Sequence, residues 1–137
     1  AEKEKLIFIV NQLGLSAFVT FKGNIPHNEV IKTMNKYDYY IQYSLQEGFC
    51  NAVVEAQAMG LLCIVSDADG LQENVLHNKT GWVVPKRNPL LLSEKIFEVI
   101  HLKQEVKIEI RQNAMERAKK EFNLDKQKES FKSFYLN

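Results

Sequence analysis

The stretch "YDYYIQYSLQEGFCNAVVEAQAMGLLCIVSD", residues 37–67, has the apolar pattern of a strand, a helix and a second strand. Residues 37–44 are rich in tyrosine and end in a polar loop, and residues 51–60 are apolar with several helix-forming alanines. Residues 61–67 form a continuous apolar run, which is typical of a parallel strand covered on both faces. The stretch therefore predicts two parallel strands joined by a crossover helix.

The same alternation of strands and helices extends to both sides of this unit. Before it, we expect a helix ending at Gly14, a strand over 17–23 and a helix over 27–36. After it, we expect a loop over 68–75, a strand over 80–85, and helices over 88–102, 104–122 and 125–135. Asn88 and Pro89 suit the cap and the first position of a helix. The fold class is therefore α/β, a Rossmann-like and mostly parallel sheet with flanking helices.

Composition narrows the classes of protein that fit. A chain of 137 residues with 45% hydrophobic and 26% charged residues predicts a single domain over 1–137. A net charge of +1 gives no general attraction to nucleic acid. Cys50 and Cys63 lack metal-ligand spacing and are too few for a disulfide framework, which favours reduced thiols and a cytoplasmic protein. We expect no transmembrane segment and no signal peptide, and contact with the inner face of the membrane stays open.

The loop between the first two strands of the unit is the expected binding edge, because ligands of α/β sheets bind beyond the carboxyl ends of the strands. Free backbone N–H groups over residues 49–52 would attract an anion such as a phosphate. Gly48 lets the backbone approach a ligand closely. Asn51 is expected to cap the helix while its amide faces the cleft. The sequence therefore predicts an anion site at the start of this helix.

Glu55 is unusual because it lies about one turn inside an otherwise apolar helix. The helix dipole favours a negative charge near this end, and a structural salt bridge could account for it. Alternatively, the carboxylate could accept two charge-assisted hydrogen bonds from adjacent ribose hydroxyls. From spacing alone, the ribose and the salt bridge are equally open interpretations.

The segment "EGFCNAVVEAQAMG", residues 47–60, resembles the Glu-x7-Glu motif of retaining glycosyltransferases of the GT-B fold, the family called group 1 or family 4. Four further segments are similar to that family in the same order, namely "VTFKGNIPHNEV" (19–30), "YDYYIQYSLQEGF" (37–49), "LLCIVSDADGLQENVLHNKTGWVVPKRNP" (61–89) and "FNLDKQKESF" (122–131). The resemblance covers nearly the whole chain. It implies the C-terminal domain of a GT-B enzyme, which holds a nucleotide-sugar donor.

The resemblance also implies roles for individual residues. Glu47 becomes the candidate catalytic residue, facing hydroxyls of the transferred sugar, while Glu55 holds the ribose hydroxyls. The other donor-binding positions lie in two loops. The loop that we call the phosphate loop contains Gly48, Phe49, Cys50 and Asn51, and the loop beside the base contains Asn24 and Ile25. The backbone amides of the phosphate loop would meet the diphosphate. Transfer with retention in this family has no agreed enzymic nucleophile, and neither a metal nor another cofactor is implied.

Compared with that family, the sequence lacks the first two strands of the domain, their basic Arg/Lys pair and the N-terminal acceptor domain. In the strand order 3-2-1-4-5-6, the absent strands would lie between strand 17–23 and strand 37–44. We therefore expect a truncated nucleotide-sugar-binding domain, inactive alone, whose parent is a hexosyltransferase-like enzyme of polysaccharide biosynthesis acting on a glycan, a lipid or another acceptor. The alternative is a non-catalytic donor-half subunit that needs a separate acceptor-half partner.

Other candidates are weaker. Glu73 matches a family glutamate, but we expect it to hold its loop together rather than contact the donor. A signalling domain of the response-regulator kind needs an acidic cluster at the strand ends, and Asp38, Asp67 and Asp69 do not form an obvious one. Nucleotide-sugar epimerases of the GT-B fold are a nearer alternative, and the spacing of the two glutamates disfavours them.

Overall fold

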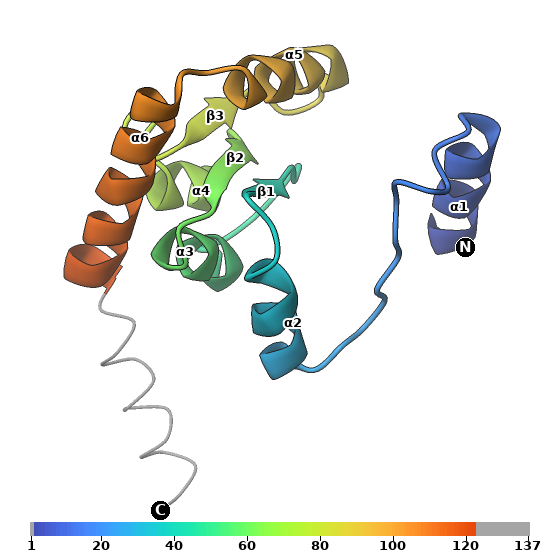
Figure 1. The fold of residues 1–137 in the computed structure, drawn as a ribbon, viewed down its shortest axis with the longest axis horizontal. Coiled ribbons are helices and arrows are strands. Elements are labelled where there is room, and N and C mark those ends of the chain that lie inside the picture. Colours follow the sequence, from blue (N-terminus) through green and yellow to red (C-terminus); the bar gives the residue numbers. More distant parts are fainter. Residues whose placement is uncertain (1, 123–137) are drawn as a thin grey trace, which may run out of the picture. The chain divides into compact units, whose positions relative to one another are not determined.

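The computed structural model describes residues 2–122, which fall into two compact units divided after Lys32 (Figure 1). The first unit contains α1 (Glu2–Gln12), an extended segment and the beginning of α2 (His27–Met34). Helix α1 confirms the predicted helix, and Gly14 follows it with φ of +69°, a conformation that glycine adopts without strain. Every residue of α1 is at least partly exposed. The expectation of a single domain stays a prediction.

The predicted strand over 17–23 is wrong, because these residues form turns and extended chain without strand pairing. A strand is defined by hydrogen bonds to a neighbouring strand, and the described part of the first unit contains no other strand. The β-branched and aromatic residues of this segment therefore give it an extended backbone but no ladder.

The second unit is built on a three-stranded parallel sheet in the order β1-β2-β3. The strands are β1 (Tyr39–Gln42), β2 (Leu62–Ser66) and β3 (Trp82–Val84). Tyr39 is in register with Leu62 in the first pair, and Ile64 with Trp82 in the second. All five residues of β2 are buried. The sheet therefore confirms the predicted α/β class, and within the strand predicted over 61–67 it confirms burial on both faces for residues 62–66.

Helices cover this sheet on both faces (Figure 1). They are α3 (Asn51–Ala58), α4 (Asp69–Asn74), α5 (Pro89–Ile100) and α6 (Gln104–Arg117), and α6 continues as a π-helical turn, η1 (Ala118–Phe122). The main core cluster joins Leu62 and Ile64 of β2 to Val99 of α5 and Ile110 of α6. Among the described helices, none is long and apolar enough to cross a membrane.

Local sequence signals predicted some of the helix boundaries and missed others. Asn88 caps α5 as predicted, since its side-chain oxygen accepts a hydrogen bond from the Leu91 N–H at 3.1 Å. The predicted loop over 68–75 is wrong, because it contains α4. Gly70 suggested a loop, but it lies in α4 and makes a close contact there with the backbone of Gly48 and Phe49. The predicted helix 104–122 ends in the π-helical turn, and the predicted helix 125–135 lies outside the described residues.

Both cysteines are free thiols in different surroundings. Cys63 is fully buried in β2, and this burial raises the pKa of its thiol to about 12. It is therefore protonated at physiological pH and acts as a small apolar core residue. Cys50 is half-buried at the start of α3.

Candidate functional site

The carboxyl ends of the three strands surround a polar pocket of about 470 Å³. The loop after β1 provides most of its wall, and the loops after β2 and β3 complete it; the lining residues are Leu45, Gln46, Glu47, Gly48, Asp69 and Lys86. The half-buried Glu47 therefore lies at the expected binding edge of the sheet. Lys86 adds a positive charge to the same pocket.

Gly70 of α4 holds the Glu47 loop at very close range. Its N–H donates to the Glu47 carbonyl at 3.0 Å. A Cβ atom on Gly70 would lie 2.0 Å from both the carbonyl carbon and the oxygen of Gly48 and 2.6 Å from the Phe49 nitrogen. Because these are backbone atoms, the loop would have to move to admit any side chain. Glycine at 70 therefore fixes the position of the loop that carries Glu47.

A chain of hydrogen bonds runs along one face of β1 toward the pocket. Ser66 Oγ of β2 donates to the Ser44 carbonyl at 2.6 Å and accepts from the Ser44 N–H at 3.1 Å. Gln42 Nε2 donates to Ser44 Oγ at 3.2 Å, and the Tyr40 hydroxyl donates to Gln42 Oε1 at 2.9 Å. Sequence reasoning missed this chain, although positions 40, 42 and 44 share one strand face and provided a signal.

Tyr40 connects the two glutamates electrostatically. Burial is the main cause that raises the pKa of its hydroxyl to about 12, and the nearby Cys50, Cys63, Glu47 and Glu55 contribute to this shift in the same direction. Tyr40 is therefore a neutral hydrogen-bond donor at physiological pH. Glu55 is half-buried on α3. Both carboxylates thus lie near enough to Tyr40 to affect its hydroxyl, while their roles toward a donor stay predictions.

Helix α3 begins at Asn51, and the predicted cap at this residue is wrong. Cys50 is the N-cap, without a side-chain cap bond, and Asn51 already belongs to the first helical turn with its side chain exposed. The helix starts one residue earlier than a cap at Asn51 requires, and the residue before it is held by Asn74 at the end of α4, whose Oδ1 accepts from the Cys50 N–H at 3.0 Å. The Cys50 amide, one of those over residues 49–52 expected to attract a phosphate, is thus engaged within the protein. The following amides have no acceptor inside the helix itself.

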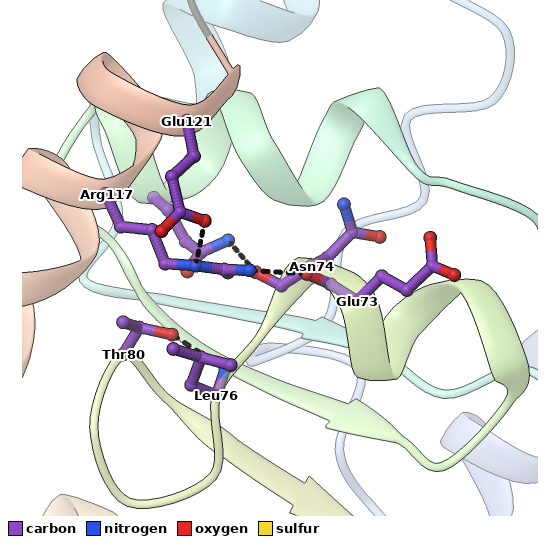
Figure 2. Close-up of polar contacts among 7 residues, drawn as sticks. Glu73, Asn74, Leu76, Thr80, Arg117 and Glu121 are labelled. Atoms are coloured by element: carbon purple, nitrogen blue, oxygen red, sulfur yellow. Dashed lines mark hydrogen bonds and ion pairs between the residues drawn. The ribbon is translucent and has the colours of Figure 1, made fainter.

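Asn74 is fully buried and is held by two further contacts (Figure 2). Its carbonyl accepts from Gln57 Nε2 of α3 at 2.9 Å and from Arg117 Nη1 of α6 at 2.8 Å. Arg117 Nη2 also donates to the Glu73 carbonyl at 2.8 Å. Residue 73 is therefore held through its backbone, in line with the expected structural role of this loop. Sequence reasoning missed Asn74 and Arg117, because their partners are far away along the chain.

The loop after β3 is fastened across the sheet edge. The Tyr43 hydroxyl donates to the Pro85 carbonyl and accepts from the Asn88 N–H, both at 2.7 Å. The Lys86 N–H donates to Asp67 Oδ1 at 2.9 Å. These contacts hold the backbone that places Lys86 on the pocket wall.

Two other expectations concern the nucleotide base and metal ions. Asn24 and Ile25 belong to the first unit, so their place beside a nucleotide base stays a prediction. Within residues 2–122, no three His, Cys, Asp or Glu side chains are grouped so that they could hold a metal ion.

The fold and the site together define an α/β domain with a ligand edge at the carboxyl ends of parallel strands and a helix start that suits an anion. The sequence model of one family, described as "Glycosyl transferases group 1", matches residues 1–121. The chain therefore belongs to this family.

Curated relatives and solved structures agree with this assignment. The putative colanic acid biosynthesis glycosyltransferase WcaL of Salmonella typhimurium is 24% identical over 127 residues, covering 88% of this chain and 31% of WcaL. The uncharacterized glycosyltransferase MJ1178 of Methanocaldococcus jannaschii is 33% identical over 98 residues, covering 72% of this chain and 28% of MJ1178. The chain thus spans about a third or less of these two relatives.

Among solved structures, the C-terminal domain of the group 1 glycosyl transferase LpcC from Francisella tularensis superposes with a TM-score of 0.78 at 24% identity, covering 88% of this chain and 62% of that one. Anabaena HepE, solved in complex with UDP and glucose, gives a TM-score of 0.80 at 24% identity, covering 95% of this chain and 36% of HepE. The fold is therefore that of a GT-B C-terminal domain.

Proposed function

We propose that this chain is the donor-binding part of a retaining, family 4 glycosyltransferase, which transfers a sugar from a nucleotide-diphosphate sugar to a glycan, lipid or other acceptor. The observation that carries the proposal is the arrangement around α3. Two carboxylates, Glu47 and Glu55, flank the start of a helix that follows the carboxyl end of β1 in a parallel sheet, and Glu47 lines the pocket at that edge. A diphosphate with a sugar on one side and a ribose on the other has matching chemistry.

Each part of the donor has a proposed partner in this arrangement. The backbone amides of Phe49 and Asn51 bind the diphosphate. The Cys50 amide does not, because it donates its hydrogen bond to Asn74. Glu55 accepts hydrogen bonds from the ribose hydroxyls, and Glu47 accepts them from the transferred sugar. Phe49 lines the phosphate loop, while Asn24 and Ile25 border the base.

In the proposed reaction, the bond between the anomeric carbon and the diphosphate oxygen breaks, and the acceptor oxygen bonds to the same face of that carbon. The acceptor proton passes to the leaving diphosphate. Glu47 orients the sugar by hydrogen bonds and need not form a covalent bond. The proposal includes no metal or other cofactor.

The rest of the reaction belongs to the full-length protein in this proposal. The acceptor is bound by a domain or partner half outside this chain, and the parent is a cytoplasmic hexosyltransferase of polysaccharide biosynthesis. The printed role of WcaL in colanic acid biosynthesis supports such a pathway. The UDP complex of HepE supports a nucleotide-diphosphate donor.

Glu55→Gln tests the ribose contact, because it keeps the size of the side chain and removes its charge. In the full-length protein, we expect the Kd of the nucleoside diphosphate to rise about tenfold or more, since charged hydrogen bonds are lost. Calorimetry with UDP, GDP and ADP identifies the diphosphate that the wild type binds, and that probe is used for the variants.

Glu94→Gln is the matched control, since it makes the same change of charge on the exposed face of α5. It should leave the Kd unchanged. Equal Kd values for the wild type and for Glu55→Gln would rule out the ribose role.

A further inference from the structure

We propose that Arg117 is a positioning residue for the phosphate-binding start of α3. This inference rests on the proposed function for the identity of the ligand and on the structure for the coupling. Arg117 lies at the last position of α6 and its side chain is only 14% exposed. It reaches the candidate site by two routes, one polar and one aromatic.

The polar route passes through the end of α4 (Figure 2). The Arg117 guanidinium donates to the Glu73 and Asn74 carbonyls, both at 2.8 Å. The last carbonyls of a helix have no acceptor role inside it, and a cation there interacts favourably with the helix dipole. With its backbone held in this way, Asn74 presents Oδ1 to the Cys50 N–H at 3.0 Å. The end of α4 thus fixes the beginning of α3.

The aromatic route passes through η1. The carbon at the centre of the Arg117 guanidinium lies 4.7 Å from the centre of the Phe122 ring. Phe122 in turn packs edge-to-face on Phe49, with 5.3 Å between the ring centres. Phe49 directly follows Gly48 in the phosphate loop. Arg117 therefore also reaches the loop through the two rings, beginning with a contact of the cation–π kind to Phe122.

The planar shape of the guanidinium is essential to this arrangement. Its Nε donates to the Glu121 carboxylate at 2.9 Å while both terminal nitrogens hold the α4 carbonyls. A lysine ammonium is a point charge on a flexible stem and cannot hold the same fork of acceptors while stacking on a ring. Arg117→Lys therefore keeps the positive charge and removes the planar group that donates to both carbonyls at once.

Arg111 provides a matched control on the same helix. Its Nε donates to the Gly60 carbonyl at 2.8 Å, which is just beyond the opposite end of α3. Arg111→Lys therefore disturbs a comparable arginine-to-backbone contact between α6 and α3, away from the phosphate loop. A general loss of stability should affect both variants alike, whereas positioning of the α3 start depends on Arg117.

The experiment compares both variants with the wild type in the full-length protein. Calorimetry with UDP, GDP and ADP gives the Kd for whichever diphosphate the wild type binds. Arg117→Lys should weaken it about tenfold, as expected for a lost charged contact, and Arg111→Lys should leave it within about twofold. Without ligand, hydrogen exchange followed by mass spectrometry should show faster exchange of the Cys50 amide region in Arg117→Lys alone.

Equal effects of the two substitutions, or wild-type affinity and exchange in Arg117→Lys, would overturn the proposal. If the wild type binds none of the three diphosphates, the proposed function is wrong, and the exchange measurement alone decides whether Arg117 positions the α3 start.

Phe122→Leu provides a second variant should Arg117→Lys fail to fold. It removes the aromatic route only, and we expect affinity to fall about threefold; an unchanged affinity would contradict that route.

Discussion

Gly70→Ala should reduce sugar transfer by the full-length protein about a hundredfold or more, because a displacement of about 1 Å at a reacting group has an effect of this size. The added Cβ would lie 2.0 Å from the backbone of Gly48, so the loop carrying Glu47 must shift. The hydrogen bond from the Gly70 N–H to the Glu47 carbonyl, 3.0 Å long, would then be strained or lost. Initial rates of transfer from the cognate nucleotide sugar provide the measurement.

Gly14→Ala separates this effect from general strain. Gly14 has φ of +69°, and a Cβ there would meet no atom within 4 Å. That substitution therefore adds backbone strain of about 1 kcal/mol without a clash. Circular dichroism should show both variants folded. Transfer by Gly70→Ala within threefold of the Gly14→Ala rate would show that the loop position does not matter for activity.

Glu47→Ala should lower kcat about a hundredfold while the Kd for the nucleoside diphosphate stays within about twofold. The reason is that Glu47 lines the pocket at the sheet edge and is proposed to contact the sugar, not the nucleotide. Hydrogen bonds that strengthen as the sugar reacts affect turnover more than ground-state binding. Discrimination between donor sugars should also weaken, which competition between two nucleotide sugars would reveal.

The Glu55→Gln variant is the counterpart in this experiment. Its defect should appear in the Kd of the free nucleoside diphosphate, and the defect of Glu47→Ala should appear in kcat. If both variants lost nucleotide affinity equally, the division of the donor between the two carboxylates would be wrong.

Local sequence patterns were sufficient to predict an element where the structure of that element depends on its own residues. The apolar run of β2 predicted burial on both faces of the sheet, and Asn88 followed by Pro89 predicted the start of α5. The segment 17–23 shows the limit of such patterns. Its residues favour an extended backbone, but a strand also needs a partner, which the described part of its unit does not contain.

The candidate site also contains residues that the sequence could predict and residues that only the fold brings together. Glu47, Gly48 and Glu55 lie within one short segment, so their spacing was informative. Asn74 and Arg117 act on that segment from α4 and α6, and only the folded chain brings them to Cys50 and its neighbours. This also explains the error at Asn51. An asparagine at a helix start is a good cap in isolation, but here the helix already includes Asn51, and an asparagine from a different helix holds the amide of the N-cap residue Cys50.

A crystal structure of the full-length protein with its nucleoside diphosphate would test the central claim most directly. We expect the phosphates at the first amides of α3, the ribose hydroxyls within hydrogen-bond distance of Glu55, and the terminal phosphate directed toward Glu47. Asn74 should still hold the Cys50 amide. A diphosphate bound away from the start of α3, or a ribose without contact to Glu55, would contradict it.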